Sequence, residues 1–209
     1  MPQATPPTTA QFTAYQAMYD WLNEKLFAGA LPSVILNFSR KGRTYGFFAP
    51  SRWDDGRTVT HEISLNPSHL KDRPAVEVAS TLAHEMCHLW QHVHGTPSRT
   101  GYHNREWAAQ MDLIGLVPSD TGEPGGKKTG QHMTHYIASA GRFMVAFRAM
   151  PREYLLPWQC IPEHERQPGG NPERSKTKYS CPLGHGNVWG KPDLLLVCGV
   201  CAQPYTPEL

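Results

Sequence analysis

The chain has 209 residues, of which 39% are hydrophobic and 18% charged, and its formal net charge is +2. This length suffices for one globular domain, or for one domain and a small module. So small a net charge does not by itself indicate nucleic-acid binding. Because no apolar run approaches the ~20 residues of a membrane span, we expect no membrane partner.

The first ten residues predict a disordered lead and lack the basic and apolar segments of a secretory signal. Five cysteines are present, at Cys87, Cys160, Cys181, Cys198 and Cys201. Without a secretory signal, an odd number of cysteines favours free thiols or metal ligands over disulfides. We therefore expect a cytoplasmic location.

A helix and three strands are predicted first. Aromatic and apolar residues from Phe12 to Leu26 recur every three or four positions and predict an amphipathic helix that ends near Gly29. Two β-rich runs, 34–38 and 45–48, flank a glycine-containing turn and predict a hairpin.

Residues 58–66 alternate between apolar and polar and predict a third strand with one solvated face. His61 and Glu62 fall on opposite faces of this strand. We expect both to be structural rather than metal ligands.

A long helix follows. Asp72 and Pro74 suit its cap and first turn, and Gly95 and Pro97 end it. Its apolar stripe consists of Val78, Leu82, Met86, Leu89 and Val93. The spacing therefore predicts a helix of about twenty residues after three strands.

This helix carries the motif His84-Glu85-x-x-His88. Residues four apart share one helix face, so both imidazoles can reach one metal ion. Glu85 can then take a proton from a water held by that metal. The alternative is a chance match on a histidine-rich helix, but a helix after strands is the context that the motif requires.

A catalytic zinc ion normally takes three protein ligands, and three residues compete for the third position. His94 has the spacing of a metzincin motif, but Gln91 stands where that motif needs a helix-breaking glycine. Glu106 would complete a site of two histidines and one glutamate. His103 follows a glycine-containing loop and begins the next predicted helix, which can fold back over the first. We therefore favour His103.

Residues 118–131 are polar and predict irregular structure, and 133–150 predict an extended piece followed by a helix or strand. Residues 166–178, rich in proline and glycine and then basic, predict a linker. Residues 179–209 then form a separate small unit.

The segments Ala83-His84-Glu85-Met86-Cys87-His88 and Gly101-Tyr102-His103-Asn104-Arg105-Glu106-Trp107 resemble the SprT-like metallopeptidase family. Members of that family share the first motif on a helix, with a third histidine at the start of the next helix. The resemblance covers residues 12–115 and extends to the tail. Two departures are Tyr102, which separates Gly101 from His103, and Asn104, which stands where glycine is common.

The resemblance implies an α+β fold with a zincin-like metallopeptidase core over residues 11–165. It implies that one zinc ion, held by His84, His88 and His103, acts with Glu85 to hydrolyse peptide bonds. Protein substrates that are bound or crosslinked to DNA are implied as partners. Four residues are available as oxyanion donors: Tyr102, His132, His135 and Tyr136. An edge strand among residues 34–66 would suit an extended peptide.

SprT-like proteins often end in a zinc ribbon of two Cys-x-x-Cys knuckles, and the tail resembles one. Cys198 and Cys201 form the second knuckle, whereas Gly184 replaces the second cysteine of the first. His185 would complete a structural zinc site with Cys181, Cys198 and Cys201. The alternative is a ribbon without metal.

Near this ribbon, aromatic and cationic residues lie together, which suits stacking and phosphate contacts with single-stranded or damaged DNA. The candidates are Trp189, Lys191, Lys178 and Lys176. The alternative is a solvated linker with one tryptophan over a small core. An alternative for the whole chain is a DNA- or protein-binding adaptor with a weakly active or inactive metallopeptidase core.

Overall fold

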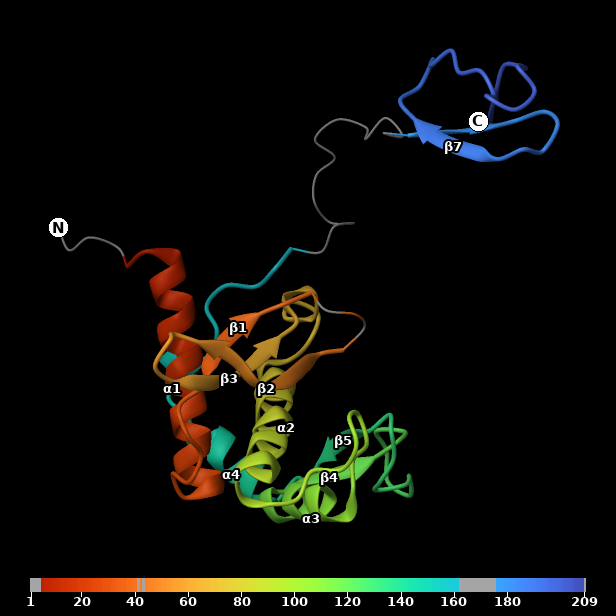
Figure 1. The fold of residues 1–209 in the computed structure, drawn as a ribbon. Helices are drawn as coiled ribbons and strands as arrows, with labels where there is room; N and C mark the ends of the chain where they lie inside the picture. Colours follow the sequence, from red (N-terminus) through yellow and green to blue (C-terminus); the bar gives the residue numbers. More distant parts are fainter. Residues whose placement is uncertain (1–4, 41, 43, 162–175, 209) are drawn as a thin grey trace. The chain divides into compact units, whose positions relative to one another are not determined.

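The computed structural model describes residues 5–40, 42, 44–161 and 176–208. Residue contacts divide the chain into two compact units, 1–162 and 163–209. The first unit combines helices with two small sheets, and the second holds a three-stranded sheet (Figure 1). The fold is therefore of mixed α and β type, as predicted. No helix among the described residues is long and apolar enough to cross a membrane.

Helix α1 (Pro7–Phe27) begins inside the segment expected to be a disordered lead. The expectation for residues 1–10 is therefore wrong from Pro7 onward, and residues 1–4 lie outside the described part. Proline is favoured at the first helical position because its missing N–H has no helical partner there. One face of α1 is buried in the core through Tyr15, Met18, Tyr19, Leu22 and Leu26.

The first sheet contains β1 (Ile35–Phe38), β2 (Gly46–Asp54) and β3 (Val59–Leu65) in the order β1-β3-β2. The predicted hairpin of the first two strands is wrong, because β3 lies between them. β3 pairs parallel with β1 and antiparallel with β2. β2 is consequently an edge strand.

The prediction of a solvated face on β3 is also wrong. Glu62 is only 4% exposed and Ser64 is fully buried. The Glu62 carboxylate accepts hydrogen bonds from Trp53 Nε1 at 2.7 Å and Ser64 Oγ at 2.6 Å. These bonds replace water around the charge, which allows β3 to occupy the centre of the sheet.

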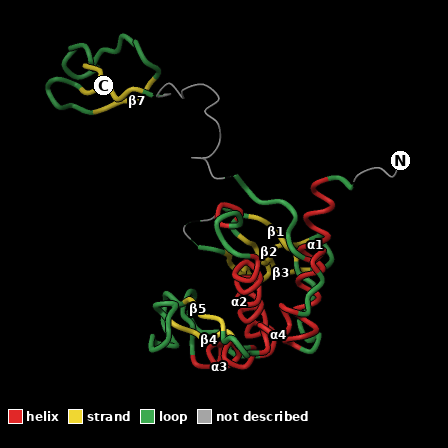
Figure 2. Tube along the Cα trace, turned by 180° about the vertical axis from the view of Figure 1, so that it is seen from behind, coloured by secondary structure: helices red, strands yellow, loops and turns green. Residues whose placement is uncertain are grey.

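Helix α2 (Ala75–His94) follows the short 3-10 helix η1 (Pro67–His69). It has 20 residues and ends at Gly95, as the spacing predicts, although Pro74 rather than Asp72 occupies the N-cap. The long helices α1 and α2 run side by side, and α1 extends past the three-stranded sheet toward the N-terminus (Figures 1 and 2). The middle of α2 is buried in the core on nearly all sides.

The chain then forms α3 (Arg105–Ile114), β4 (Leu116–Ser119), β5 (Thr134–Ile137) and α4 (Arg142–Arg148). β4 and β5 pair antiparallel, with Pro118 opposite His135. Gly115 joins α3 to β4 with φ +88°, and a Cβ there would meet Arg142 N at 2.9 Å. This glycine therefore allows α4 to pack against the turn that starts the hairpin.

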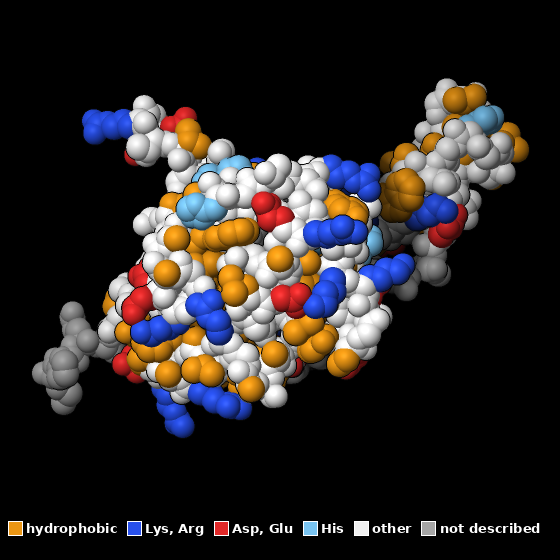
Figure 3. Space-filling view, turned by 90° about the horizontal axis from the view of Figure 1, so that it is seen from below, with side chains coloured by type: hydrophobic (Ala, Val, Ile, Leu, Met, Phe, Trp, Pro, Cys, Tyr) orange, Lys and Arg blue, Asp and Glu red, His pale blue; other side chains and the backbone are white. Residues whose placement is uncertain are grey.

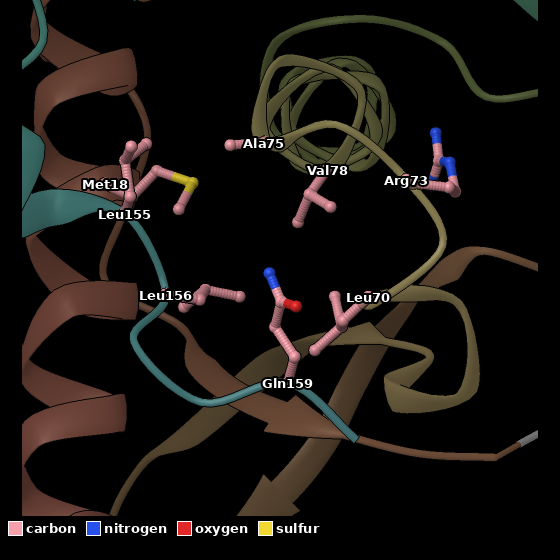
Figure 4. Close-up of a pocket in the computed structure, with 8 residues that line it drawn as sticks. All are labelled: Met18, Leu70, Arg73, Ala75, Val78, Leu155, Leu156 and Gln159. Atoms are coloured by element: carbon pink, nitrogen blue, oxygen red, sulfur yellow. The ribbon is translucent and has the colours of Figure 1, made fainter. Parts of the chain in front are cut away.

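After α4 and the 3-10 helix η2 (Arg152–Tyr154), the chain returns along α1. Residues 155–159 close a small cavity beside the start of α2, with Leu155, Leu156 and Gln159 facing it (Figure 4). Its volume of about 30 Å³ is sufficient for one water molecule.

The second unit contains β6 (Thr177–Ser180), β7 (Asn187–Gly190) and β8 (Thr206–Glu208) in the order β7-β6-β8. Tyr179 is buried at its centre and donates a hydrogen bond to the Lys191 carbonyl oxygen at 2.6 Å. β6 includes the last two residues of the predicted linker 166–178. Residues 166–175 of that linker lie outside the described part.

Candidate metal centre and cleft

A cleft of about 750 Å³ opens between the edge strand β2, helix α2 and the loops around residues 97–103 and 131–135. Its floor includes His84, Glu85 and His88, all on α2. The four-residue spacing places the two imidazoles on one face of the helix, and their ring centroids are 5.2 Å apart. The cleft is thus large enough for a peptide segment and exposes the motif to it.

His103 joins the two histidines of α2. The ligand atoms available on His84, His88 and His103 all lie within 4.8 Å of one another. His103 Nδ1 lies 3.2 Å from the Gly130 carbonyl oxygen, and the backbones of His103 and Gly130 form a bridge. Because that carbonyl accepts the Nδ1 proton, the Nε2 lone pair of His103 remains available to a metal.

The two competing third ligands are engaged elsewhere. His94 Nε2 lies 3.0 Å from the Ala30 carbonyl oxygen. Glu106 Oε2 accepts hydrogen bonds from Gln91 Nε2 and from the Thr96 amide, each at 2.7 Å. The structure therefore brings His103, rather than His94 or Glu106, to the histidines of α2.

Asn104, at the position where the family commonly has glycine, is the N-cap of α3. Its Oδ1 accepts the Trp107 amide at 3.0 Å and Gln91 Nε2 at 2.7 Å. Its Nδ2 donates to the Thr96 carbonyl oxygen at 3.1 Å. Asn104 therefore links the end of α2 to the start of α3, immediately after His103.

Trp107 forms the wall behind the three histidines. Its fully buried ring stacks on His88 at 18° and 5.2 Å, and it meets His84 and His103 edge to face. These ring contacts restrict the rotamers of all three imidazoles. In the sequence Trp107 stands out as an apolar residue of α3 and as the aromatic residue of the segment that resembles the family.

Burial lowers the pKa of His84 well below its usual value and the pKa of His88 to about 3. Burial also lowers the pKa of His103. All three imidazoles are consequently neutral near pH 7 and have lone pairs to offer. Three neutral imidazoles facing an open cleft are a donor set that fits zinc with one position left for water.

Glu85 is buried beside this cluster, and burial raises its pKa to about 8 although the Phe48 amide donates a hydrogen bond to the carboxylate. Gly46, on the same strand as Phe48, permits the close approach of α2. A Cβ at Gly46 would meet Ser64 O at 2.9 Å, Thr81 Cγ2 at 3.1 Å and Glu85 Cγ at 3.4 Å. The edge strand therefore holds the carboxylate in place at the cleft.

His135, on β5, is a site residue whose position the sequence does not reveal. Its Nδ1 lies 3.2 Å from His84 Nδ1, and its Nε2 lies 3.0 Å from Ser80 Oγ. Both of its nitrogens are therefore engaged, and it is unsuited to be an oxyanion donor. Tyr136, the next residue on the strand, faces the opposite side. Tyr102 and His132 both line the cleft.

The tail forms a second cluster, made of Cys181, His185, Cys198 and Cys201, whose ligand atoms all lie within 4.8 Å. His185 Nδ1 lies 3.5 Å from Cys181 Sγ and 3.8 Å from Cys198 Sγ. Backbone hydrogen bonds from Cys201 and Val200 lower the pKa of Cys198 to about 6, which favours the thiolate that zinc binds. Three thiols and one imidazole fit a closed, tetrahedral zinc site.

Gly184 occupies the turn of the first knuckle with φ +76°, and its amide donates to the Cys181 carbonyl oxygen at 2.9 Å. This left-handed conformation is unfavourable for cysteine and natural for glycine. His185, the next residue, points its Nδ1 at the thiols instead. The candidate ligand of the first knuckle is therefore residue 185 rather than residue 184.

The candidate DNA-binding residues are distributed over the second unit. Trp189 on β7 is 62% exposed and lies opposite Lys178 on β6. Lys178 Nζ forms an ion pair with Glu208 at 2.9 Å, whereas Lys176 is exposed. One face of the first unit, seen in Figure 3, carries lysine and arginine side chains scattered among hydrophobic ones.

The model of the SprT-like family matches residues 15–129, more than half of the chain. A protein from Salmonella typhimurium, described as "Uncharacterized protein in mucB 3'region", is 38% identical over 56 residues. The aligned part covers 25% of this chain and 76% of that protein. No solved structure matches the chain. The family match contains all three clustered histidines and Glu85 but ends before β5.

Proposed function

The chain belongs to the SprT-like family, and on that premise we propose that it is a zinc-dependent metallopeptidase with a zincin-like core. Membership of the family suggests a metallopeptidase-like domain. The observation that carries the proposal is the convergence of His84, His88 and His103 within 4.8 Å beside Glu85, on the floor of an open cleft. An adaptor with an inactive core would have no need of a buried, well-held carboxylate at that position.

In the proposed reaction, His84, His88 and His103 hold the zinc ion. When bound, zinc supplies a Lewis acid that polarises the scissile carbonyl and acidifies water. Glu85 accepts a proton from the attacking water at its carboxylate and passes it to the leaving nitrogen. The raised pKa of Glu85 suits the second of these transfers, since a carboxylic acid must then donate. Tyr102 and His132, which line the cleft, are the candidates that remain as oxyanion donors.

The substrate is proposed to be an extended polypeptide that lies along β2. This strand is at the edge of its sheet and lines the cleft through Gly46, Phe47 and Phe48. An extended peptide can add to a sheet as a further strand at its edge. The Phe48 amide donates a hydrogen bond to the Glu85 carboxylate. A peptide on this edge would therefore pass beside the catalytic carboxylate.

The test compares wild type with Glu85→Gln in the cleavage of casein and of a DNA-bound protein, with and without a chelator. We expect cleavage by the wild type only, its loss with chelator, and recovery when zinc is added back. Glu85→Gln should retain zinc at the histidine cluster and lose cleavage. Equal cleavage by both proteins would overturn the proposal, and so would chelator-insensitive cleavage.

We further propose that the tail binds a second, structural zinc ion, as a ribbon with the ligands Cys181, His185, Cys198 and Cys201. A unit of this size has too small a core to be stable without such a cross-link. Wild type should contain two zinc ions per chain and Cys198→Ser only one. If wild type and Cys198→Ser both contain a single zinc ion, the ribbon binds no metal and this proposal is wrong.

DNA is the partner that we propose for the second unit, with protein substrates bound to that DNA. The exposed Trp189 ring and the exposed Lys176 support this proposal, since a base can stack on the ring while the ammonium group contacts a phosphate. The ion pair of Lys178 with Glu208 weakens the contribution expected of Lys178.

A further inference from the structure

A chain of three hydrogen-bonding contacts leads from the metal cluster to the backbone of α2. The Nδ1 atoms of His84 and His135 are 3.2 Å apart. His135 Nε2 is 3.0 Å from Ser80 Oγ. The Ser80 hydroxyl in turn donates to the carbonyl oxygen of Glu77, also at 3.0 Å. Ser80 and Glu77 are on the same helix as His84. The series of contacts therefore starts from α2 at His84 and returns to α2 at Ser80, one turn earlier.

The donation from Ser80 to the Glu77 carbonyl oxygen is the contact of known direction, and the directions of the other two are inferred from it. The Ser80 hydroxyl donates to the Glu77 carbonyl oxygen, which only accepts and also receives Thr81 Oγ1 and Arg73 Nη2, each at 3.0 Å. The Ser80 oxygen then accepts, which requires the proton of His135 to be on Nε2. A neutral imidazole carries a single N–H. His135 Nδ1 is therefore an acceptor, and the proton between the two histidines belongs to His84 Nδ1.

The consequence lies at the other nitrogen of His84. With its proton on Nδ1, His84 presents an unprotonated Nε2 to His88 and His103. The opposite tautomer would place a hydrogen where a metal ion must bind. A histidine partner is ambiguous because it can donate or accept, unlike the Gly130 carbonyl oxygen that orients His103. Ser80 and Glu77 remove that ambiguity.

We propose that His135 is a positioning residue which, through Ser80 and the Glu77 carbonyl, fixes His84 as its Nδ1–H tautomer before any metal binds. The strand pair β4 and β5 then orients two of the three ligands, since its His135 contacts His84 and the loop within it provides Gly130 to His103. This inference rests on the proposed metal site but not on peptide-bond hydrolysis.

The direct test is the tautomeric state of the metal-free wild-type protein, read from long-range nitrogen–proton correlations of the histidine rings. We expect the pattern of an Nδ1–H imidazole at His84 and of an Nε2–H imidazole at His135. An Nε2–H pattern at His84 would overturn the proposal. Because no zinc is present in this measurement, its result does not depend on whether the protein is a peptidase.

The second test is the zinc affinity of the histidine cluster, measured with a competing chelator while the ring resonances of His88 and His103 report occupancy. His135→Phe keeps a ring but removes the acceptor, and we expect affinity to fall about 10- to 100-fold. His135→Asn keeps an oxygen near the position of Nδ1 and should be closer to wild type than to His135→Phe. Ser80→Ala should allow both tautomers at His135 and weaken zinc binding less than His135→Phe.

The matched control is His94→Phe, a change of the same type on α2, the helix that carries His84. His94 is exposed and contacts the Ala30 carbonyl oxygen rather than a ligand. The zinc affinity of the His94→Phe variant should equal that of wild type. If His135→Phe also binds zinc as tightly as wild type while remaining folded by circular dichroism, the positioning role is refuted. If wild type itself binds no zinc at this cluster, the proposed function fails, whereas the tautomer measurement still tests His135.

Discussion

Gln91 and Glu106 are joined across the junction of two helices, with Gln91 Nε2 donating to Glu106 Oε2 at 2.7 Å. Gln91 is in the last turns of the buried helix α2, and Glu106 is in the first turn of α3. The same carboxylate accepts the Thr96 amide, so it also holds the loop between the helices. His103 lies at the end of that loop. The pair therefore contributes to the placement of His103 beside the histidines of α2.

We predict that Glu106→Ala impairs the metal site without removing a ligand. The change leaves the buried Gln91 amide group without one of its two acceptors and loosens the junction, at a cost of about 1–3 kcal/mol in unfolding free energy. Zinc affinity at the histidine cluster should fall with it. Glu24→Ala is the control, because the exposed ion pair of Glu24 with Lys25 contributes about 0–1 kcal/mol. Denaturant unfolding and chelator competition check both effects, and unchanged zinc binding in Glu106→Ala would contradict the prediction.

We predict that Gly46→Ala lowers the catalytic rate. The added methyl group would be 2.9 Å from Ser64 O and 3.4 Å from Glu85 Cγ, so β2 must move away from α2. The Phe48 amide would then move away from the Glu85 carboxylate that it holds. Steady-state cleavage of a peptide measures the change, with Gly199→Ala as the control because a methyl group there would meet open space. A normal rate in Gly46→Ala would show that the contact is not required.

Acid should destabilise the metal-free protein. Burial lowers the pKa of His88 to about 3 and, with the charge of Arg73, the pKa of His135 to about 4. In the unfolded chain both groups take up a proton near pH 6.5. Their contribution to stability is therefore complete above pH 6.5 and is lost as the pH falls from 6.5 toward 4 and 3. Melting temperatures across this range should fall, and less steeply in His135→Asn, which has one titrating group fewer. A flat profile would contradict the assignment.

The ionisation of Glu85 should make the metal-free protein less stable as the pH rises, which is the opposite of the effect of the histidines. Burial raises its pKa to about 8, so between about pH 4.5 and 8 the unfolded chain loses a proton that the folded chain retains. The stability contribution is complete below pH 4.5 and is lost as the pH rises to 8. Glu85→Gln cannot ionise, so it should be more stable than wild type at pH 9, by on the order of a few kcal/mol. Near pH 4 the two proteins should melt alike, and equal stability at pH 9 would refute the prediction.

DNA binding by the second unit should depend on stacking and on salt. Trp189→Ala should weaken binding to a single-stranded oligonucleotide by about 1–3 kcal/mol per stacked base. Lys176→Ala should reduce the salt dependence of the binding constant, since one phosphate contact is lost. Lys178→Ala should have a smaller effect because Lys178 is paired with Glu208. Fluorescence anisotropy at several salt concentrations measures all three, and binding that is insensitive to salt and to Trp189→Ala would exclude this surface.

The tertiary structure decided the arrangement of the first sheet. By local pattern, residues 34–38 and 45–48 are expected to pair with one another, because both are β-rich and a glycine-containing turn connects them. β3 separates them because its Glu62 and Ser64 satisfy one another and Trp53, so that both faces of this strand can be buried. Such hydrogen bonds between side chains leave no periodic trace in the sequence.

By itself, the sequence determined the α2 helix, the placement of His84 and His88 on one face and Glu85 beside them, and the second knuckle of the tail. These features depend on residues only a few positions apart, whose geometry follows from the repeat of a helix or the span of a turn. Only the tertiary structure decided between His103, His94 and Glu106, and only it brought His135 to His84 from a strand 51 positions away. The physical reason is that these choices depend on which buried polar atoms find partners across the fold, and no local spacing encodes that.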